Sequence, residues 1–399
     1  MEENVSKYTN AIGSGKQAIT QGQKRKGGRG MREGWEYICF ESCLNKIPKA
    51  KQVTTKEYNS GTKYPIISQE DKLISGYYDD ESMLFHIDKP VIIFGDHTRV
   101  LKYIDFDFVV GADGVKIISP KENLNAKFLL YFLTWYNIPN LGYSRHYKLL
   151  KELDIPVPPL STQLSIVSEL DKINELIRLK REQLKDYDNL AQSIFYEMFG
   201  DPVVNEKGWE VKKLGEVSMI KTGPFGSMLH KEDYITGGIP LINPMHIQNF
   251  KAVPDKDFTI SMEKAAELCN YQLKINDVIF ARRGDIGRCA VISDKEAGYL
   301  CGTGSLFVRF ERKLSSVYTM YAVRTTSFIK ELVSKAKGAT MLNLNSSTME
   351  NLRFPIPPLP LQQLFAQRIE LIEKQKAEIQ RTISDLETLL ASRMQYWFD

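Results

Sequence analysis

Apolar residues recur at alternating spacings of three and four along two long stretches of the chain, within residues 156–200 and 355–399. This is the a/d pattern of a coiled coil, and neither seam is interrupted by Pro or Gly, so each stretch predicts one helix of roughly 50 Å. A seam this long and narrow favours pairing with another helix over burial within a single domain. The predicted seam positions are Ile166, Leu170, Ile173, Ile177, Leu184, Tyr187 and Ile194 in the first helix and Phe365, Ile369, Ile372, Ile379, Ile383, Leu386 and Leu390 in the second.

The two helices belong to an internal duplication. Pro156-Val157-Pro158-Pro159-Leu160 recurs as Pro355-Ile356-Pro357-Pro358-Leu359, an offset of 199 residues. The offset continues without a gap, pairing Gln163 with Gln362 and Phe199 with Phe398. Repetition at a fixed offset indicates two copies of one structural unit.

The segments before the two helices also resemble each other in the same order. Val91–Phe94 corresponds to Asp277–Phe280, for example, and each segment holds short β-rich runs followed by one amphipathic helix. This pattern predicts two α+β globules of similar design. The expected organisation is a basic, disordered tail (1–33), a first globule (34–155), a Pro-Pro-Leu turn with its helix (156–200), a second globule (201–354) and a second turn with its helix (355–399).

The short connection of residues 200–208 limits the geometry. The second globule must follow the end of the first long helix closely, and the second helix leaves that globule directly. If the two seams pair within one chain, they run antiparallel and hold the globules at opposite ends of a two-helix coiled coil. Parallel pairing between two chains is the alternative.

Composition and charge narrow the class of protein. Apolar residues make up 43% and charged residues 26% of the 399 residues, which is typical of a soluble globular protein. The 53 Lys and Arg exceed the 49 Asp and Glu by four, and residues 1–33 supply that whole excess. Nucleic-acid binding would therefore depend on local arrangements of charge. The longest apolar run, Phe128–Tyr136, is too short to span a membrane, and we expect a cytoplasmic protein with no membrane partner.

Residue sets required for catalysis or metal binding are missing from the sequence. Gly13-Ser14-Gly15-Lys16 lacks the first Gly and the final Ser/Thr of a phosphate-binding loop, and the five His show no metal-ligand spacing. The five Cys have no paired spacing that would indicate zinc. We expect no catalytic residues and no metal site. Two similar but divergent globules at a fixed separation indicate instead a reader of a DNA site with two unlike halves, because the major groove repeats every ~34 Å.

The doubled Pro-x-Pro-Pro-Leu motif with its Gln-containing helix, present in this order, resembles the specificity subunit of type I restriction-modification enzymes. The first globule adds Tyr64–Ser68, Phe94–Arg99 and Gly111–Val115, and the second adds Arg283–Arg288 and Gly338-Ala339-Thr340. The resemblance covers residues 34–399. It implies that each globule is a target-recognition domain and that this chain is a non-catalytic subunit.

The resemblance also implies the partners. These are double-stranded DNA, two modification (methyltransferase) subunits that dock on the helices, and restriction (translocase-nuclease) subunits. No cofactor would bind this chain; S-adenosylmethionine would be held by the modification partner for adenine N6 methylation, and ATP and Mg by the restriction partner. The alternative function is a coiled-coil scaffold whose globules bind proteins, for which the neutral charge outside the tail is the support.

Candidate DNA-contacting residues are polar or aromatic side chains in turn-rich stretches of both globules. Arg and Lys suit guanine, Asn and Gln suit adenine, and hydroxyl groups suit phosphates. For each one the alternative is a solvated or turn-stabilising side chain. The candidates are Gln69, Tyr77, His97, Thr98, Arg99, Lys102, Tyr143, Arg145 and His146 in the first globule and Lys221, Thr222, Ser227, His246, Arg282, Arg283, Arg288, Asn343 and Asn345 in the second.

Overall fold

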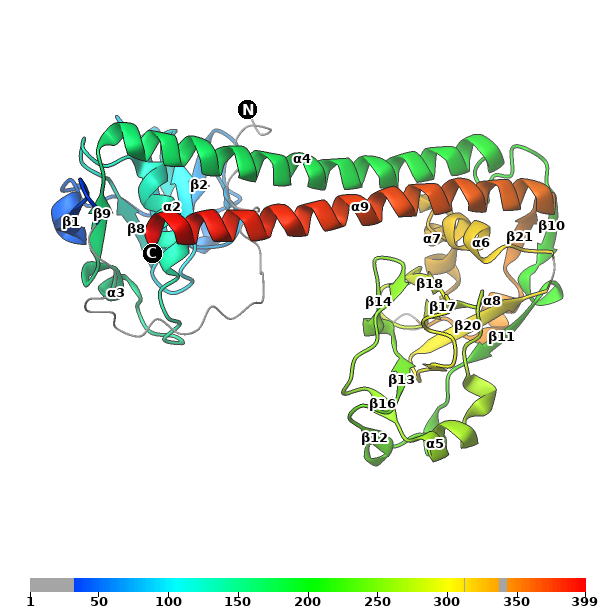
Figure 1. The fold of residues 1–399 in the computed structure, drawn as a ribbon. Helices are drawn as coiled ribbons and strands as arrows, with labels where there is room; N and C mark the ends of the chain where they lie inside the picture. The colour runs from blue at the N-terminus through cyan, green and yellow to red at the C-terminus, as the bar shows by residue number, and fades with distance from the viewer. Residues whose placement is uncertain (1–31, 312, 337–342) are drawn as a thin grey trace. The chain divides into compact units, whose positions relative to one another are not determined.

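The computed structural model describes residues 32–311, 313–336 and 343–399, and the chain divides into two compact units. The first unit contains the residues up to Leu184 together with Glu378–Asp399, and the second contains Lys185–Ala377. Each unit therefore combines one globule with the start of one long helix and the end of the other (Figure 1).

Most of the predicted tail lies outside the described residues, but Arg32 and Glu33 do not. The guanidinium of Arg32 lies 5.3 Å from the ring centre of Trp35 and 5.1 Å from that of Tyr396. These cation–π contacts attach the first described residue to the folded first unit.

The first globule contains two small sheets, a strand pair and two α-helices. One sheet has the strand order β3-β2-β7-β4, the other β6-β5-β8, and β1 pairs with β9. The elements are β1 (Glu36–Cys39), β2 (Tyr64–Ile67), β3 (Gly76–Tyr78), β4 (Leu84–Phe85), β5 (Val91–Gly95), β6 (Leu101–Ile104), β7 (Phe108–Val110), β8 (Val115–Ile118), α2 (Ala126–Tyr136), α3 (Tyr147–Lys151) and β9 (Asp154–Val157).

The second globule contains sheets of order β11-β20-β17-β18 and β12-β16-β13-β19, and the strand pairs β10-β21 and β14-β15. The elements are β10 (Glu210–Lys213), β11 (Ser218–Thr222), β12 (Tyr234–Ile235), β13 (Ile239–Ile242), β14 (Ile247–Gln248), β15 (Lys251–Ala252), β16 (Thr259–Ile260), α5 (Met262–Glu267), β17 (Val278–Ala281), β18 (Cys289–Val291), β19 (Leu300–Cys301), β20 (Ser305–Phe310), α6 (Ser316–Val323), α7 (Thr326–Lys335), α8 (Ser346–Glu350) and β21 (Arg353–Ile356).

The two globules share one design, which confirms the internal repeat and the α+β class. In each, one parallel strand pair forms at the same place: Ile66 of β2 lies opposite Val109 of β7, and Leu241 of β13 lies opposite Leu300 of β19. In each, a fully buried strand, β5 or β17, forms a hairpin with the strand that follows it. Their uninterrupted apolar runs fit burial on both faces.

The long helices are α4 (Leu160–Phe199) and α9 (Leu359–Phe398), and they pair within the chain. In the first unit, Glu169 of α4 accepts hydrogen bonds from Arg393, while Arg181 donates to Glu387 at 2.7 Å. Because rising numbers in α4 meet falling numbers in α9, the pairing is antiparallel. The second unit shows the same direction, with Lys376 of α9 bonded to Asp188 at 2.8 Å and the ring of Phe365 5.3 Å from that of Phe199.

The seam between the helices follows the predicted positions for most of their length. Buried are Ile166, Leu170, Ile173, Ile177, Phe365, Ile369, Ile372, Ile379, Ile383 and Leu390, whereas Leu184, Tyr187, Ile194 and Leu386 are half-buried. Near the C-terminal end of each helix the buried positions become Phe195 and Phe199 in α4 and Met394 and Phe398 in α9. An α-helix drifts from a strict 3.5-residue repeat, and each of these ends packs on a globule helix as well as on the first part of the other long helix.

A buried glutamine joins the start of each long helix to its own globule. Gln163 has no exposed surface; its Oε1 accepts from the backbone N–H of Asn125, and its Nε2 donates to the carbonyls of Asn123 and Pro158, all at 2.7–2.8 Å. Asn125 is the N-cap residue of α2. The amide therefore satisfies polar groups at a helix start that would otherwise be buried unpaired.

Gln362 makes the same three bonds in the second unit. Its Oε1 accepts from the N–H of Ser315, the N-cap of α6, at 2.7 Å. Its Nε2 donates to Lys313 O at 3.1 Å and to Pro357 O at 2.7 Å.

The far end of each long helix packs on the other globule's helix through an aromatic pair. The ring of Phe199, at the end of α4, lies 4.7 Å from that of Tyr318 on α6, and the ring of Phe398, at the end of α9, lies 5.5 Å from that of Phe128 on α2. Edge-to-face pairs of this kind add specificity to apolar burial.

A buried lysine fixes the turn after β2. Lys102 of β6 is 1% exposed, and its Nζ donates to the carbonyls of Ser68, at 2.8 Å, and of Lys72. Burial lowers the pKa of Lys102 to about 8, although Glu70 and Asp71 oppose the shift.

We predict that Gln362→Leu lowers the free energy of unfolding by about 3 kcal/mol, because the Ser315 N–H and two carbonyls lose their partner. The matched control is Gln363→Leu at the neighbouring exposed position, which should change little. Urea unfolding of both variants measures the difference, and equal shifts of the two midpoints would contradict the structural role of Gln362.

Lys102 should give the first unit a pH dependence of defined sign. Between the folded pKa of about 8 and the usual 10.5, the unfolded chain holds the proton that the folded chain has released. The contribution of Lys102 to the free energy of unfolding therefore rises with pH in this window and is constant below it. From pH 8 to 10, wild type should lose about 2 kcal/mol less than Lys102→Met. Calorimetry tests this with exposed Lys56→Met as control; parallel profiles of wild type and Lys102→Met would refute it.

Candidate nucleic-acid interface

Two loops of the first globule that are far apart in sequence lie together. The turn of residues 96–100 joins β5 to β6, and the loop of residues 138–146 joins α2 to α3. Asp96 connects them: its carbonyl accepts from the N–H and Nδ1–H of His146, both at 2.9 Å, and its Oδ1 accepts from the N–H of Tyr147 at 2.7 Å. Arg99, with a φ of +63°, adds a bond to the carbonyl of Ile138 at 2.9 Å. These bonds unite the two loops into one surface.

The buried side chain of His146 stabilises this surface from inside the globule. It is fully buried, and its Nε2 accepts from the N–H of Leu141 at 2.9 Å while Nδ1–H donates to Asp96. Both ring nitrogens are thus used, which requires a neutral ring with the proton on Nδ1. This corrects our prediction that His146 contacts DNA: the side chain is inaccessible and has a structural task.

Two further candidates hold turns of the first globule in place. The side-chain amide of Gln69 accepts from His97 N–H at 3.2 Å and donates to Asp113 O at 3.0 Å, so it braces the turn of residues 96–100. Lys102 is buried beneath the turn after β2 and has no surface to offer DNA, which corrects our prediction for it. The sequence showed polar side chains in turns but did not show which of them point inward.

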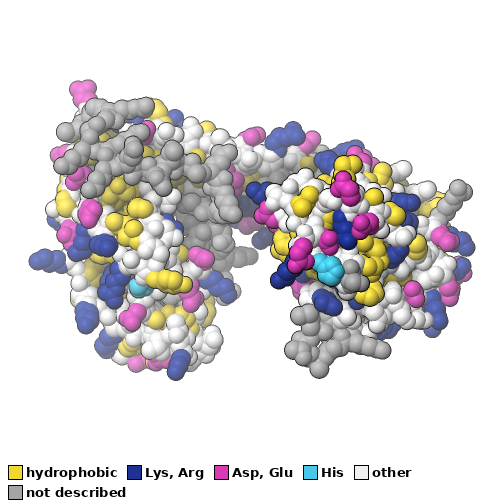
Figure 2. Space-filling model, turned by 90° about the horizontal axis from the view of Figure 1, so that it is seen from below, with side chains coloured by type: hydrophobic (Ala, Val, Ile, Leu, Met, Phe, Trp, Pro, Cys, Tyr) yellow, Lys and Arg dark blue, Asp and Glu magenta, His cyan; other side chains and the backbone are white. Residues whose placement is uncertain are grey.

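The exposed candidates of the first globule are His97, Thr98, Tyr143 and Arg145. Thr98 donates from its hydroxyl to Gln69 O at 2.6 Å, which fixes its orientation. Tyr77 is half-buried on β3, where it lies opposite Pro65 of β2. Figure 2 shows Lys and Arg side chains spread over the visible face of the first globule, at the left of that view, with Asp and Glu side chains among them.

The equivalent turn of the second globule joins β17 to β18 and carries an arginine cluster. Gly284 and Gly287 have φ values of +76° and +99°, which the turn requires and side chains rarely adopt. Arg282 donates from Nε to Leu344 O at 3.0 Å, and burial, together with the nearby Arg283, lowers the pKa of Arg282. Arg283 is exposed, and its backbone pairs with that of Asn343. The cluster therefore presents Arg283 outward on a fixed turn.

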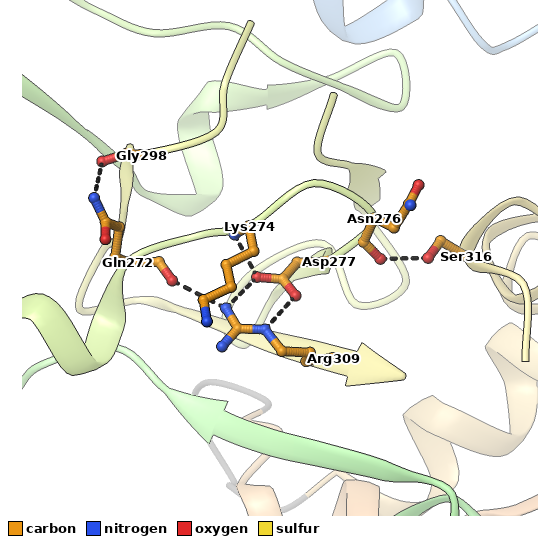
Figure 3. Close-up of polar contacts among 7 residues, drawn as sticks. All are labelled: Gln272, Lys274, Asn276, Asp277, Gly298, Arg309 and Ser316. Carbon is orange, nitrogen blue, oxygen red and sulfur yellow. Dashed lines mark hydrogen bonds and ion pairs between the residues drawn. The ribbon is translucent and has the colours of Figure 1, made fainter. Parts of the chain in front are cut away.

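An ion pair between a buried carboxylate and a half-buried arginine anchors the base of this hairpin (Figure 3). The carboxylate of Asp277, at the start of β17, accepts two bonds from the guanidinium of Arg309 on β20, at 2.8 and 2.7 Å, and one from the N–H of Lys274 at 2.7 Å. The hydroxyl of Ser316 donates to the carbonyl of Asn276 and so joins the same corner to α6. Bidentate geometry and full pairing suit this carboxylate to a buried position.

The remaining candidates of the second globule lie at varied depths. His246 is buried with Nδ1 2.9 Å from Leu241 O and its ring 5.0 Å from that of Phe258, which corrects our prediction of DNA contact. Asn345 caps α8 by accepting from Thr348 N–H at 2.7 Å. The side chain of Ser227 and the segment Gly338-Ala339-Thr340 lie outside the described residues. Half-buried are Lys221, Thr222, Arg288, Asn343 and Asn345, with Lys221 Nζ 4.9 Å from the ring centre of Tyr271 and Arg288 Nε 3.7 Å from Asp285.

Asp96 is the organising residue that our sequence reasoning missed. It is buried, and it holds the start of α3 through its carboxylate and the ring of His146 through its carbonyl. Its position directly after a buried strand and a glycine was the available signal, but the sequence does not reveal its partner.

Within the described part of the chain, no group of three or more His, Cys, Asp or Glu is arranged to hold a metal ion. Among the same residues, none of the helices combines the length and the apolar character needed to cross a membrane.

Relatives of this chain are similar to it in sequence over most of its length. A specificity subunit of the type I restriction enzyme MjaIX from Methanocaldococcus jannaschii is 26% identical over 65% of this chain and 66% of that protein. The EcoR124I/EcoR124II specificity subunit from Escherichia coli is 24% identical over 83% of this chain and 85% of that protein.

The fold has a solved counterpart. The S subunit of a type I restriction-modification system from M. genitalium superimposes with a TM-score of 0.53 at 15% identity, covering 90% of this chain and 96% of that one. The family model of the type I restriction modification DNA specificity domain matches twice, at residues 32–186 and 206–388. Because these two matches include both globules and most of both long helices, the chain belongs to the type I restriction-modification DNA specificity family.

Proposed function

We propose that the two globules each read one half of a split, asymmetric site in double-stranded DNA. The observation that carries this proposal is the pair of equivalent turns after β5 and β17: the backbone framework is shared, but one turn carries His97, Thr98 and Arg99 and the other carries Arg282 and Arg283. A shared scaffold with unlike exposed groups suits two half-sites of unlike sequence.

Arg283 and Arg145 are the residues best suited to base or phosphate contact. Both are exposed on loops that other bonds hold in place. A guanidinium reaches guanine O6 and N7 bidentately, whereas His97 and Thr98 offer single hydrogen bonds. Buried His146 keeps the loop of Arg145 in shape, whereas Lys102 stabilises the turn after β2 and His246 the segment after β13.

In this proposal α4 and α9 set the gap between the two halves of the DNA site. The antiparallel pairing and the unbroken length of each helix support this role. The exposed surfaces of the helices would dock two modification subunits, which hold S-adenosylmethionine and methylate adenine at N6. Restriction subunits with ATP and Mg would add cleavage, and this chain would supply recognition without catalysis.

We predict that Arg283→Ala weakens binding of the assembled modification complex to its site by about 1 to 3 kcal/mol and relaxes discrimination at one base position. Fluorescence anisotropy gives the affinity, and sequencing of methylated adenines gives the preference. Lys295→Ala removes the same charge from an exposed position outside the turn and is the matched control. Unchanged affinity together with an unchanged methylation pattern would remove Arg283 from the interface.

Four residues inserted after Leu184, with four matching residues after Arg381 of the paired helix, should lengthen the accepted gap while leaving both halves unchanged. Each insertion adds about 6 Å, close to two base pairs. Sequencing of methylated DNA from cells carrying the variant measures the gap. An active variant that still methylates at the original gap would exclude a spacer role for the helices.

A further inference from the structure

Tyr143 is the most exposed large hydrophobic side chain of the described first globule. Its relative exposure is 102%, so the ring is uncovered, and Leu141 two residues earlier is also exposed. Between them Gly142 adopts a φ of +67°, and its N–H donates to Asn140 Oδ1 at 2.9 Å. The loop tip thus presents an aromatic and an aliphatic side chain to solvent, which costs hydrophobic free energy until a partner covers them.

The base beneath this tip is fixed. The His146 ring receives the N–H of Leu141 and donates to Asp96 O, and Arg99 holds the carbonyl of Ile138, each at 2.9 Å. The Tyr143 ring therefore projects from a loop whose two ends are bonded to the neighbouring turn that carries His97 and Thr98. A rigid aromatic on a preorganised base loses little conformational entropy on binding.

The charge around the tip favours a polyanion over a protein surface. From Asn123 to Lys151 the sequence contains no Asp or Glu, and Arg145 and Lys148 are exposed beside the tip. The one carboxylate bonded to the start of α3, that of Asp96, is buried. Apolar wedges flanked by cations are the means by which proteins open and bend DNA base steps.

We propose that Tyr143 is a wedge that stacks on bases of the first half-site and opens a base step there. This inference rests on the proposed function and adds a distortion of the DNA to the hydrogen-bond contacts of the neighbouring turn. Stacking depends on the aromatic ring, so the phenol hydroxyl is not required. Arg145 holds the adjoining phosphates while the ring is inserted.

The experiment uses the complete complex of this chain with its modification subunit and a duplex carrying the motif that it methylates in cells. 2-Aminopurine placed at successive positions of the first half-site reports unstacking as a rise in fluorescence. Wild type should raise the signal at one step; Tyr143→Ala should abolish the rise and weaken binding about tenfold or more, and Tyr143→Phe should retain both properties. Tyr37→Ala, at a partly exposed tyrosine on β1, is the matched control.

Each of the following results would overturn the proposal that Tyr143 is a wedge. Equal fluorescence and affinity for wild type and Tyr143→Ala would show that the ring does not enter the DNA. A Phe variant as weak as the Ala variant would assign the effect to the hydroxyl. Loss of the modification subunit on purification of Tyr143→Ala would place the ring at a protein interface. Failure of the wild-type complex to bind any duplex selectively would refute the proposed function itself, which separates the two claims.

Discussion

The buried amides of Gln163 and Gln362 are the constraint on which the remaining structure depends. Each one bonds the start of a long helix to the N-cap residue of a helix in its globule and to a carbonyl of the preceding Pro-Pro turn. A buried amide with all three bonds made in one geometry fixes the direction of the long helix relative to the globule, which apolar packing alone does not do. The aromatic contacts of Phe199 and Phe398 then define where the opposite end of each helix packs.

This framework leaves the turns after β5 and β17 free to diverge. In the first globule the turn is braced by Gln69, His146 and Asp96, and in the second by the backbone of Leu344 and by glycines with positive φ. The same hairpin is therefore stabilised by different side chains, and the outward residues change without altering the strands beneath them. The strands of the two globules can therefore stay alike while the exposed residues of the turns differ.

Much of the fold was predictable from the sequence, because the repeat and the seam each extend over many residues and remain recognisable when single positions depart from the pattern. The α+β class, the duplication and the helix pairing are confirmed. The predicted positions Ile194 and Leu386 lie half-buried, since helical drift and contacts with the globules favour Phe195 and Met394 at the ends. Which polar residues are buried was not predictable. Lys102 and His146 are residue types that often contact DNA, but their hydrogen-bond partners come from segments remote in sequence.

The central claim is that this chain reads a DNA site of two unlike halves. The most direct test is sequencing of methylated bases in cells that express this chain with its candidate modification subunit, compared with cells that lack only this chain. The account predicts a new N6-methyladenine motif of two different halves separated by a fixed, unspecified gap. No new motif from cells in which the complex is assembled and stable, or a motif with two identical halves, would contradict it.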